Sequence, residues 1–297
     1  MKFSFQPENY FNFWTGQIFS PSFRIGEDIP QEINPYDPEK IAVVLLDEQG
    51  QKTGTVTYFT NIADTRTFLR NRSSETATRE ERYFVSIGKR SGITTIENQG
   101  FGACTNLVSI VISKQVVSAG TSAFSGCTNL VSVEIKNNAM TLGQNMFSSC
   151  TALSDFDFPG EITAIPQGVL NGCSSVTSVS VPSGVTTIGK YAFQGTGISS
   201  VIIPDGVTKL DGSTFRNCTS LSSVLLSNTL TKLSAYEFEG CTALTSMVIP
   251  SSVTSIWQNA FNHCDNLLSI TINKSSGSIS GSPWGATNAT VTWGGSS

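Results

Sequence analysis

Hydrophobic residues recur along most of this chain with one fixed spacing. A large apolar residue appears every 23 positions, with one interval of 22, at Phe101, Phe124, Phe147, Leu170, Phe193, Phe215, Phe238 and Phe261. A smaller residue follows each of them three positions later, at Cys104, Cys127, Cys150, Cys173, Thr196, Cys218, Cys241 and Cys264. Such a regular period indicates one structural unit used eight times.

The pattern inside each unit predicts a strand. Six positions after each large residue, or five after Phe193, begins the spacing L-x-x-L-x-L, as in Leu107, Ile110 and Ile112. Its second half alternates as a strand does. A turn and a short V-x-x-I segment follow, such as Val185 and Ile188. A unit this small cannot bury its apolar edge alone, so the units are expected to stack into a solenoid with a shared core.

The unit resembles the BspA-like, or Treponema-type, leucine-rich repeat, which reads approximately I-G-x-x-A-F-x-G-C-x-x-L-x-x-V-x-I-P. The segments IGKYAFQG and FEGCTALTSMVIP match it best, and the resemblance covers about residues 93–273. It implies a right-handed leucine-rich-repeat solenoid with a parallel β-sheet on one face and short helical or irregular turns on the other. At a strand spacing of about 4.8 Å, eight repeats at 91–273 would give a sheet roughly 40 Å long.

Residues 1–90 lie outside this resemblance and predict a small α+β module. The segments IAVVLL and TGTVTYF read as a β-hairpin, and the charged segment DTRTFLRNRSSETATREERYF reads as partly helical. More than half of the charged residues lie in this region, and Arg216 is the only arginine beyond it. The module is a possible anchoring or assembly domain.

The first 23 residues are rich in aromatic side chains, which include Phe11, Phe13, Trp14 and Phe19. So many aromatic rings need burial, either in the core of the module or against a partner. These four residues are therefore candidates for an assembly anchor. At the other end, residues 274–297 contain SPWGATNATVTW, whose Trp284 and Trp293 favour a C-terminal cap over a ligand-stacking site.

The reactive residue types do not form a catalytic or metal-binding pattern. Metal sites need paired cysteines or histidines two to four positions apart, whereas the seven cysteines follow the repeat period singly. The cysteine row is therefore predicted to be small buried side chains that pack under the Phe row. His263, the only histidine, is expected to be an exposed turn residue. We expect no enzyme activity, cofactor or metal.

Strand alternation predicts which side chains face outward from the sheet. One row is small and mostly polar: Ser109, Ser132, Asp155, Ser178, Ser200, Ser223, Ser246 and Ser269. The neighbouring row changes from acidic to aliphatic: Val111, Glu134, Asp157, Ser180, Ile202, Leu225, Val248 and Thr271. The candidate ligand-binding surface is therefore Ile202, Leu225 and Val248, together with Glu134, Asp155, Asp157 and Ser180. Preference of aliphatic residues for strands, or packing under the N-terminal region, is the alternative explanation.

Charge and hydropathy restrict the partners. The net charge of −4 and the pI of about 5.1 provide no basic field for nucleic acid. No run approaches the roughly 20 apolar residues that membrane insertion needs, and the first residues lack a secretory-signal pattern.

The sequence therefore favours a non-enzymatic binding and attachment protein whose partner is a protein or glycan on a host or neighbouring cell surface. The resemblance implies a bacterial cell-surface adhesin, whereas the N-terminal sequence favours a phage virion component of fibre, tail or head-decoration type. The virion is placed first, the bacterial cell surface is the alternative, and an intracellular interaction scaffold is third. In the virion reading, residues 1–90 contact a structural partner or another copy of the chain.

Overall fold

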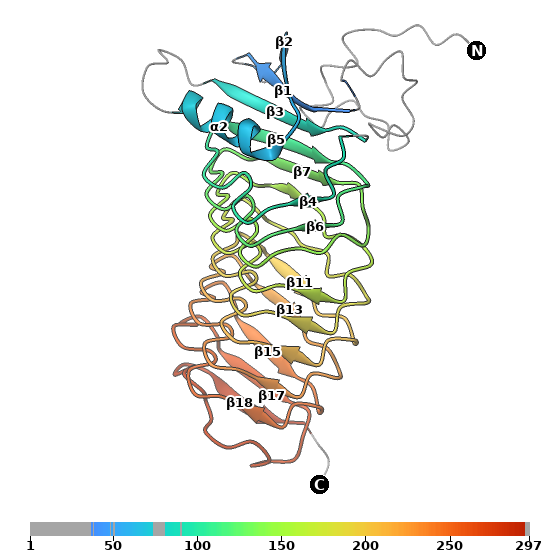
Figure 1. The fold of residues 1–297 in the computed structure, drawn as a ribbon. Helices are drawn as coiled ribbons and strands as arrows, with labels where there is room; N and C mark the ends of the chain where they lie inside the picture. The colour runs from blue at the N-terminus through green and yellow to red at the C-terminus, as the bar shows by residue number, and fades with distance from the viewer. Residues whose placement is uncertain are drawn as a thin grey trace, which may run out of the picture.

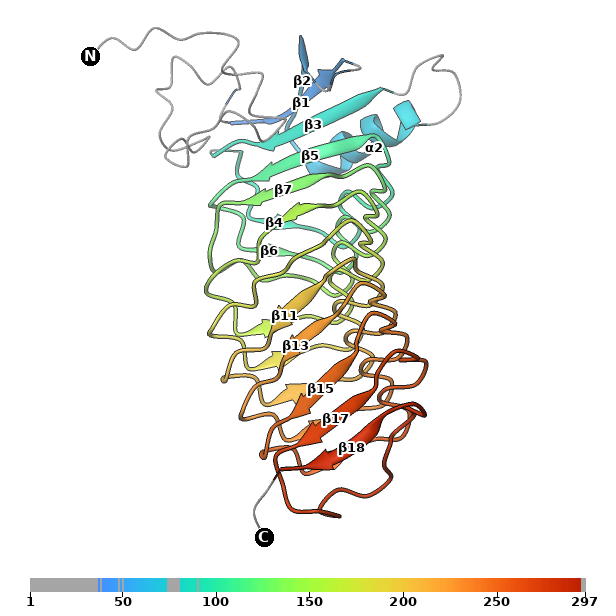
Figure 2. The ribbon, with the colours of Figure 1, turned by 180° about the vertical axis from the view of Figure 1, so that it is seen from behind.

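The computed structural model describes residues 37, 39–47, 49, 51–73, 81–89 and 91–294. The chain winds into an elongated solenoid in which successive repeats stack in sequence order (Figure 1). Seen from behind, the longer strands follow one another along the array (Figure 2). The predicted solenoid with a parallel sheet on one face is confirmed.

The longer strands form the sheet that the L-x-x-L-x-L pattern predicted. They are β5 (Leu107–Ile112), β7 (Ser132–Ile135), β8 (Asp155–Phe156), β11 (Ser200–Ile202), β13 (Ser223–Leu225), β15 (Ser246–Ile249), β17 (Ser269–Ile272) and β18 (Thr290–Trp293). Equivalent residues of successive repeats pair in parallel, for example Ile202 with Leu225. The fourth repeat departs from the pattern, because residues 177–181 form no assigned strand between β8 and β11.

The V-x-x-I segments form a second set of short parallel strands. They are β4 (Thr95–Ile96), β6 (Ser118–Ala119), β9 (Ala164–Ile165), β10 (Thr187–Ile188), β12 (Lys209–Leu210), β14 (Lys232–Leu233) and β16 (Ser255–Ile256). The second residue of each is buried in the core, while the residue before it points outward. Most repeats thus contribute one strand to each of two sides of the solenoid and one irregular turn to the third.

The turns hold the Phe row in place through an unusual backbone pattern. The residues two before and two after each buried Phe or Leu have left-handed φ angles: Gln99, Ser122, Asn145, Gly168, Tyr191, Ser213, Tyr236 and Asn259, then Ala103, Gly126, Ser149, Gly172, Gly195, Asn217, Gly240 and His263. In most repeats the N–H groups of the large residue and of these two neighbours donate to carbonyls of the following repeat, as Gln99, Phe101 and Ala103 do to Thr121, Ala123 and Ser125. The backbone itself therefore joins one turn to the next.

The aromatic rings stack along the core. Neighbouring rings lie 5.3 to 5.6 Å apart where Phe follows Phe, for example between Phe215 and Phe238 at 5.4 Å and 2°. Leu170 interrupts the row. Phe156 and Phe158 connect the two parts, because Phe156 contacts Phe147 and Phe158 contacts Phe193.

The N-terminal part contains β1 (Ile41–Leu46), β2 (Lys52–Phe59), the helix α2 (Ile62–Ser73) and β3 (Arg82–Ile87). The hairpin of β1 and β2 and the helix were predicted. The strand β3 was not, because its first three residues were assigned to the charged segment. This strand pairs antiparallel with β1 and parallel with β5, so the sheet order is β2-β1-β3-β5-β7-β8. The boundaries at residues 90 and 273 stay predictions, and one sheet crosses the first of them.

Helix α2 covers the turns at the N-terminal end of the array (Figure 1). Its first turn is capped by Asn61, whose side chain accepts the Asp64 N–H at 2.8 Å. At the other end β18 pairs in register with β17, and Trp284 is buried while Trp293 is half-buried. The burial of Trp284 favours packing over ligand stacking.

Candidate functional site

The cysteine row is buried and unpaired, as the spacing predicted. All seven cysteines are free. From the second repeat on, each thiol donates to the backbone carbonyl of the Phe in the preceding repeat, at 2.9 to 3.1 Å, as Cys127 does to Phe101. Burial raises the pKa of Cys104 and Cys218 to about 11 and that of Cys150 to about 12. These thiols are therefore held protonated and serve as hydrogen-bond donors.

Among the described residues, the other reactive side chains to consider are His263 and the carboxylates. His263 is exposed with φ of 56°, in agreement with its predicted place in a turn. Within the described ranges, no group of three or more His, Cys, Asp or Glu residues is arranged to hold a metal ion. None of the helices in that part of the chain has the length and apolarity of a membrane-spanning helix.

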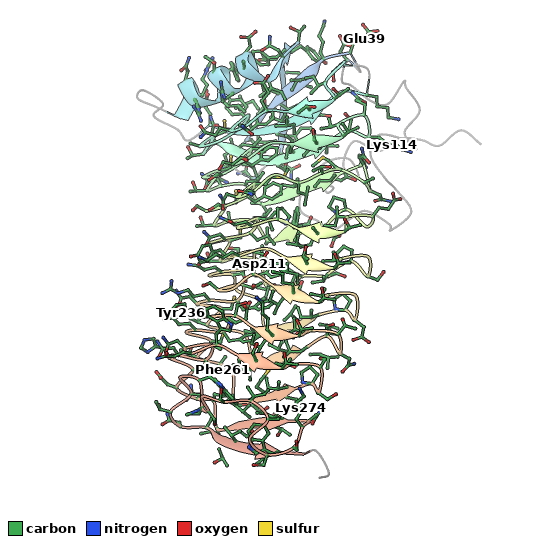
Figure 3. All side chains as sticks on the ribbon, turned by 60° about the horizontal axis from the view of Figure 1, so that its bottom comes forward. Glu39, Lys114, Asp211, Tyr236, Phe261 and Lys274 are labelled. Atoms are coloured by element: carbon green, nitrogen blue, oxygen red, sulfur yellow. The ribbon has the colours of Figure 1, made fainter. Side chains whose placement is uncertain are left out.

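The outer face of the longer-strand sheet presents the predicted surface rows. Side chains fill the space between strands and turns along the whole array, with Tyr236 on the turn side and Lys114 and Lys274 on the opposite side (Figure 3). The second residue of most strands points into the core, and the residues on either side of it point out. A ligand on this face would contact equivalent positions of successive repeats, about 4.8 Å apart.

Three consecutive aliphatic side chains on this face form what we call the aliphatic stripe: Ile202, Leu225 and Val248. They are 66%, 61% and 53% exposed. Ile202 and Leu225 are direct cross-strand neighbours, and β15, which carries Val248, follows β13. Ser200, Ser223 and Ser246 run beside the stripe and are exposed. The surface therefore combines an apolar row with a parallel row of hydroxyl groups.

The acidic candidates lie toward the N-terminal end of the same face. Asp155 and Asp157 are exposed, and Asp155 is in register with Ser132. Glu134 is half-buried and forms an ion pair with Lys136. Ser180 is exposed in the fourth repeat, where strand pairing lapses, so it separates the acidic residues from the aliphatic stripe.

The first repeat does not follow the predicted surface rows. Ser109 and Val111 were expected to face solvent, but they are 4% and 9% exposed. Both side chains point outward from the sheet, beside Phe84 and Ser86 of β3. Strand alternation alone does not explain this burial. The solvent-exposed part of the outer face begins at β7.

Two features of the structure were not anticipated. Leu268, one residue before β17, is 62% exposed and adds an aliphatic side chain beside the strand that carries Val248. Glu237 is fully buried next to Phe238, where other repeats carry neutral residues such as Ala123 and Ala260. Its position before the Phe is the only sequence signal for this burial.

The candidate assembly residues Phe11, Phe13, Trp14 and Phe19 lie outside the described residues. Their assignment as an anchor stays a prediction.

Comparison with known proteins identifies the repeat. Residues 94–222 and 186–289 match the sequence model of the BspA type leucine rich repeat region, with six copies. No curated protein matches the chain.

Several solved structures are similar in fold. A leucine-rich repeat protein from Bacteroides ovatus has 20% identity and a TM-score of 0.44, and the match covers 88% of this chain and 71% of that protein's chain. The leucine rich repeat protein of T. pallidum has 21% identity and a TM-score of 0.41, covering 65% and 86%. A leucine rich cell surface protein from Faecalibacterium prausnitzii has 20% identity and a TM-score of 0.33, covering 68% and 83%.

Proposed function

Because this chain belongs to the BspA-type leucine-rich repeat family, we propose that it is a non-enzymatic binding and attachment protein. Its partner is a protein or glycan on a host or neighbouring cell surface. The observation that carries the proposal is the exposure of the aliphatic stripe on a sheet face whose other outward residues are mostly polar from β7 onward. Contiguous exposed apolar surface is a common mark of an interaction site.

The stripe is not needed for packing of the repeats. Its side chains point away from the core, and other strands of the same row carry Thr271 or Thr292, which suit a strand equally well. Exposed aliphatic side chains lose unfavourable contact with water when a partner covers them, at about 25 cal/mol per Å² of apolar surface. The neighbouring serines can orient a polar partner group.

The finer part of the proposal concerns the particle that carries the protein. We place it on a phage virion, with the N-terminal module toward the particle and the stripe, in the C-terminal half of the array, directed outward. The arrangement along the solenoid supports such a polarity, because the module and the stripe lie far apart (Figure 1). The alternative is a bacterial cell-surface adhesin of the BspA-like type.

The stripe is tested by replacing Ile202, Leu225 and Val248 together with Ser. Labelled protein is titrated onto intact bacterial cells and onto their separated protein and polysaccharide fractions. We expect at least tenfold weaker binding, because three apolar contacts are lost, with an unchanged unfolding midpoint. Val117→Ser is the matched control, since Val117 is also 53% exposed but lies beside the short strands. Equal binding by the triple variant would place the site elsewhere.

The carrier is tested separately by immunogold labelling of purified virions and of intact bacteria. Labelled virions with unlabelled cells support the virion. Labelled cells from which no labelled particle can be purified support the adhesin.

A further inference from the structure

A second apolar cluster lies on the outer face of the sheet at its N-terminal end. We call it the outer cluster and define it as Ala42, Val44, Leu46, Phe84 and Val111. It is separate from the main core, which contains the alternate residues of the same strands, such as Val43, Val85 and Ile110. The sheet is thus apolar on both faces here, whereas farther along it is apolar mainly on the inner face.

Strand register places the cluster on one continuous surface. Val44 of β1 pairs with Phe84 of β3, and Phe84 is in register with Ser109 of β5. The buried Ser109 and Val111 therefore belong to the same surface as β1. This surface continues in line with the row that carries the aliphatic stripe.

The outer cluster is buried as deeply as the core of the solenoid. Ala42, Val44 and Phe84 are 0%, 1% and 2% exposed, in contrast to Ile202 at 66% on the same side of the sheet. A sheet leaves its outer face in solvent unless a second layer packs on it. In the described part of the chain, the other apolar residues that pack against the cluster are Val56 and Val108, and both belong to the sheet itself. A further layer is therefore required.

We propose that residues 1–36 of the same chain form this layer. They precede β1 directly, so the covalent link keeps them at high local concentration beside the face. The first 23 residues include Phe11, Phe13, Trp14 and Phe19, and aromatic rings bury large apolar areas. A separate partner would have to supply the same area without this link.

The proposal changes the role of the aromatic segment. Its rings complete an intramolecular core instead of anchoring the chain in an assembly. The segment also closes the outer face over β1, β3 and β5, so the surface open to a ligand begins at β7, where Glu134 is the first charged outward residue.

The contact is tested in the full-length chain by a double-mutant cycle between Trp14→Ala and Val44→Ala. Each change should lower the urea midpoint, and together they should lower it by less than the sum, because either change loosens the same layer over the outer cluster. Val248→Ala is the matched control: it is also a valine on the outward side of a strand, and its effect should add to that of Trp14→Ala. Additive effects in both pairs would overturn the proposal. If Trp14→Ala does not fold, Trp14→Phe serves in its place.

The occupant is tested by inserting a protease site after Asp37, next to the exposed Glu39. After cleavage, the released segment of residues 1–37 should stay bound to the rest of the chain during gel filtration at the mass of one copy. Val44→Asp should release it, and Val248→Asp should not. Loss of the segment from the unmutated cleaved protein, or a mass of two copies that falls on dilution together with the protection of the face, would overturn the proposal in favour of a partner or a second copy.

Discussion

The hydrogen bond of the thiol group explains the preference for cysteine three positions after the Phe. The thiol hydrogen reaches a backbone carbonyl one repeat earlier, and this carbonyl also accepts an N–H within its own turn, as Phe101 does from Cys104. Thr196 has the same burial but bonds Phe193 of its own repeat at 2.8 Å. The cysteine thiol thus bonds a carbonyl of the preceding repeat, whereas the Thr196 hydroxyl bonds a carbonyl of its own repeat and lies 3.4 Å from the Cys218 thiol of the next one.

Glu237 is an acidic residue that is fully buried. Its carboxylate accepts the Thr214 N–H at 3.1 Å, but its second oxygen has no hydrogen-bond partner. Burial, assisted by the negative charge of Asp211, raises its pKa from 4.5 to about 7. The folded protein therefore keeps the proton where the unfolded chain has released it.

The pH dependence of stability follows from this difference. The proton on Glu237 favours the folded state below about pH 4.5, and this contribution is lost as the pH rises to about 7. Glu237→Gln keeps a neutral polar group, so its stability relative to the unchanged protein should rise by about 3 kcal/mol between pH 4.5 and about pH 8. Urea unfolding at several pH values measures this rise.

The control for Glu237 is Glu161→Gln, since Glu161 is exposed. Its relative stability should change little over the same range. A pH-independent difference for Glu237→Gln would contradict the raised pKa.

Compensation between neighbouring elements keeps the aromatic core continuous. Leu170 is smaller than the Phe of the other repeats, and the space is taken from the strand side by Phe156 and Phe158. Position 158 holds Ile in several repeats, for example Ile112 and Ile249. The smaller Leu170 and the larger Phe158 therefore compensate for each other in volume.

We expect Leu170→Phe alone to destabilise the protein by about 1–3 kcal/mol, because it adds volume to a filled core. Phe158→Ile alone should also destabilise it by leaving a cavity. The double variant restores the arrangement of the other repeats, so its free energy of unfolding should lie closer to that of the unchanged protein than the sum predicts. Urea denaturation measures all three, and simple additivity would show that the residues do not share the space.

Elements inside the repeat could be predicted because the core needs the same residue types at each period. β5 begins at Leu107, where the spacing places it, and β15 begins two residues after the expected Leu244. β3 could not be recognised in the same way, because Arg82–Ile87 is a single short apolar run next to a charged segment. It lies before the first repeat, so the repeat period does not predict its pairing with β5. The absence of an assigned strand at 177–181 likewise has no signal in TSVSV, which alternates like its neighbours.

At the scale of the molecule, α2 substitutes for a missing preceding repeat. Gly102 occupies the position of Ser125, whose carbonyl accepts the Ala103 N–H, and the Arg70 side chain supplies the donor instead, with Nε at 2.9 Å. Asn106 bonds the Leu69 carbonyl of α2 as Asn129 bonds Thr105 of the first repeat. The helix therefore meets the array through contacts that a repeat would make.

Arg70→Met should loosen this end selectively. Loss of a charged donor to a half-buried carbonyl should cost about 1–2 kcal/mol. Amide hydrogen exchange should accelerate at residues 99–103 and not at residues 236–240, because repeats contact only their neighbours. Lys114→Met is the control, since Lys114 is exposed. Uniform acceleration along the chain would contradict the assignment of Arg70 to the cap.

The candidate surface was predictable only in part. Alternation correctly placed Ile202, Leu225 and Val248 outside, because outward positions depend on local geometry. It failed for Val111, which lies on the outward side of β5 but is buried. Ligand binding itself depends on a partner, so its assignment to these residues stays a prediction.

The direction of the hydrogen bonds in the turns makes that side of the array electrically polar. Phe101, Phe124 and Phe147 all donate their N–H to the following repeat, and this continues to Phe261, which donates to Trp284. The peptide dipoles of these bonds therefore add along the turn side of the array, with the negative end at the first repeat. On the strand sides, N–H groups such as those of Val131 and Thr186 donate to the preceding repeat instead. Every duplication of a repeat would lengthen this dipole without changing its sign, and the arginines of α2 lie at the end that attracts positive charge.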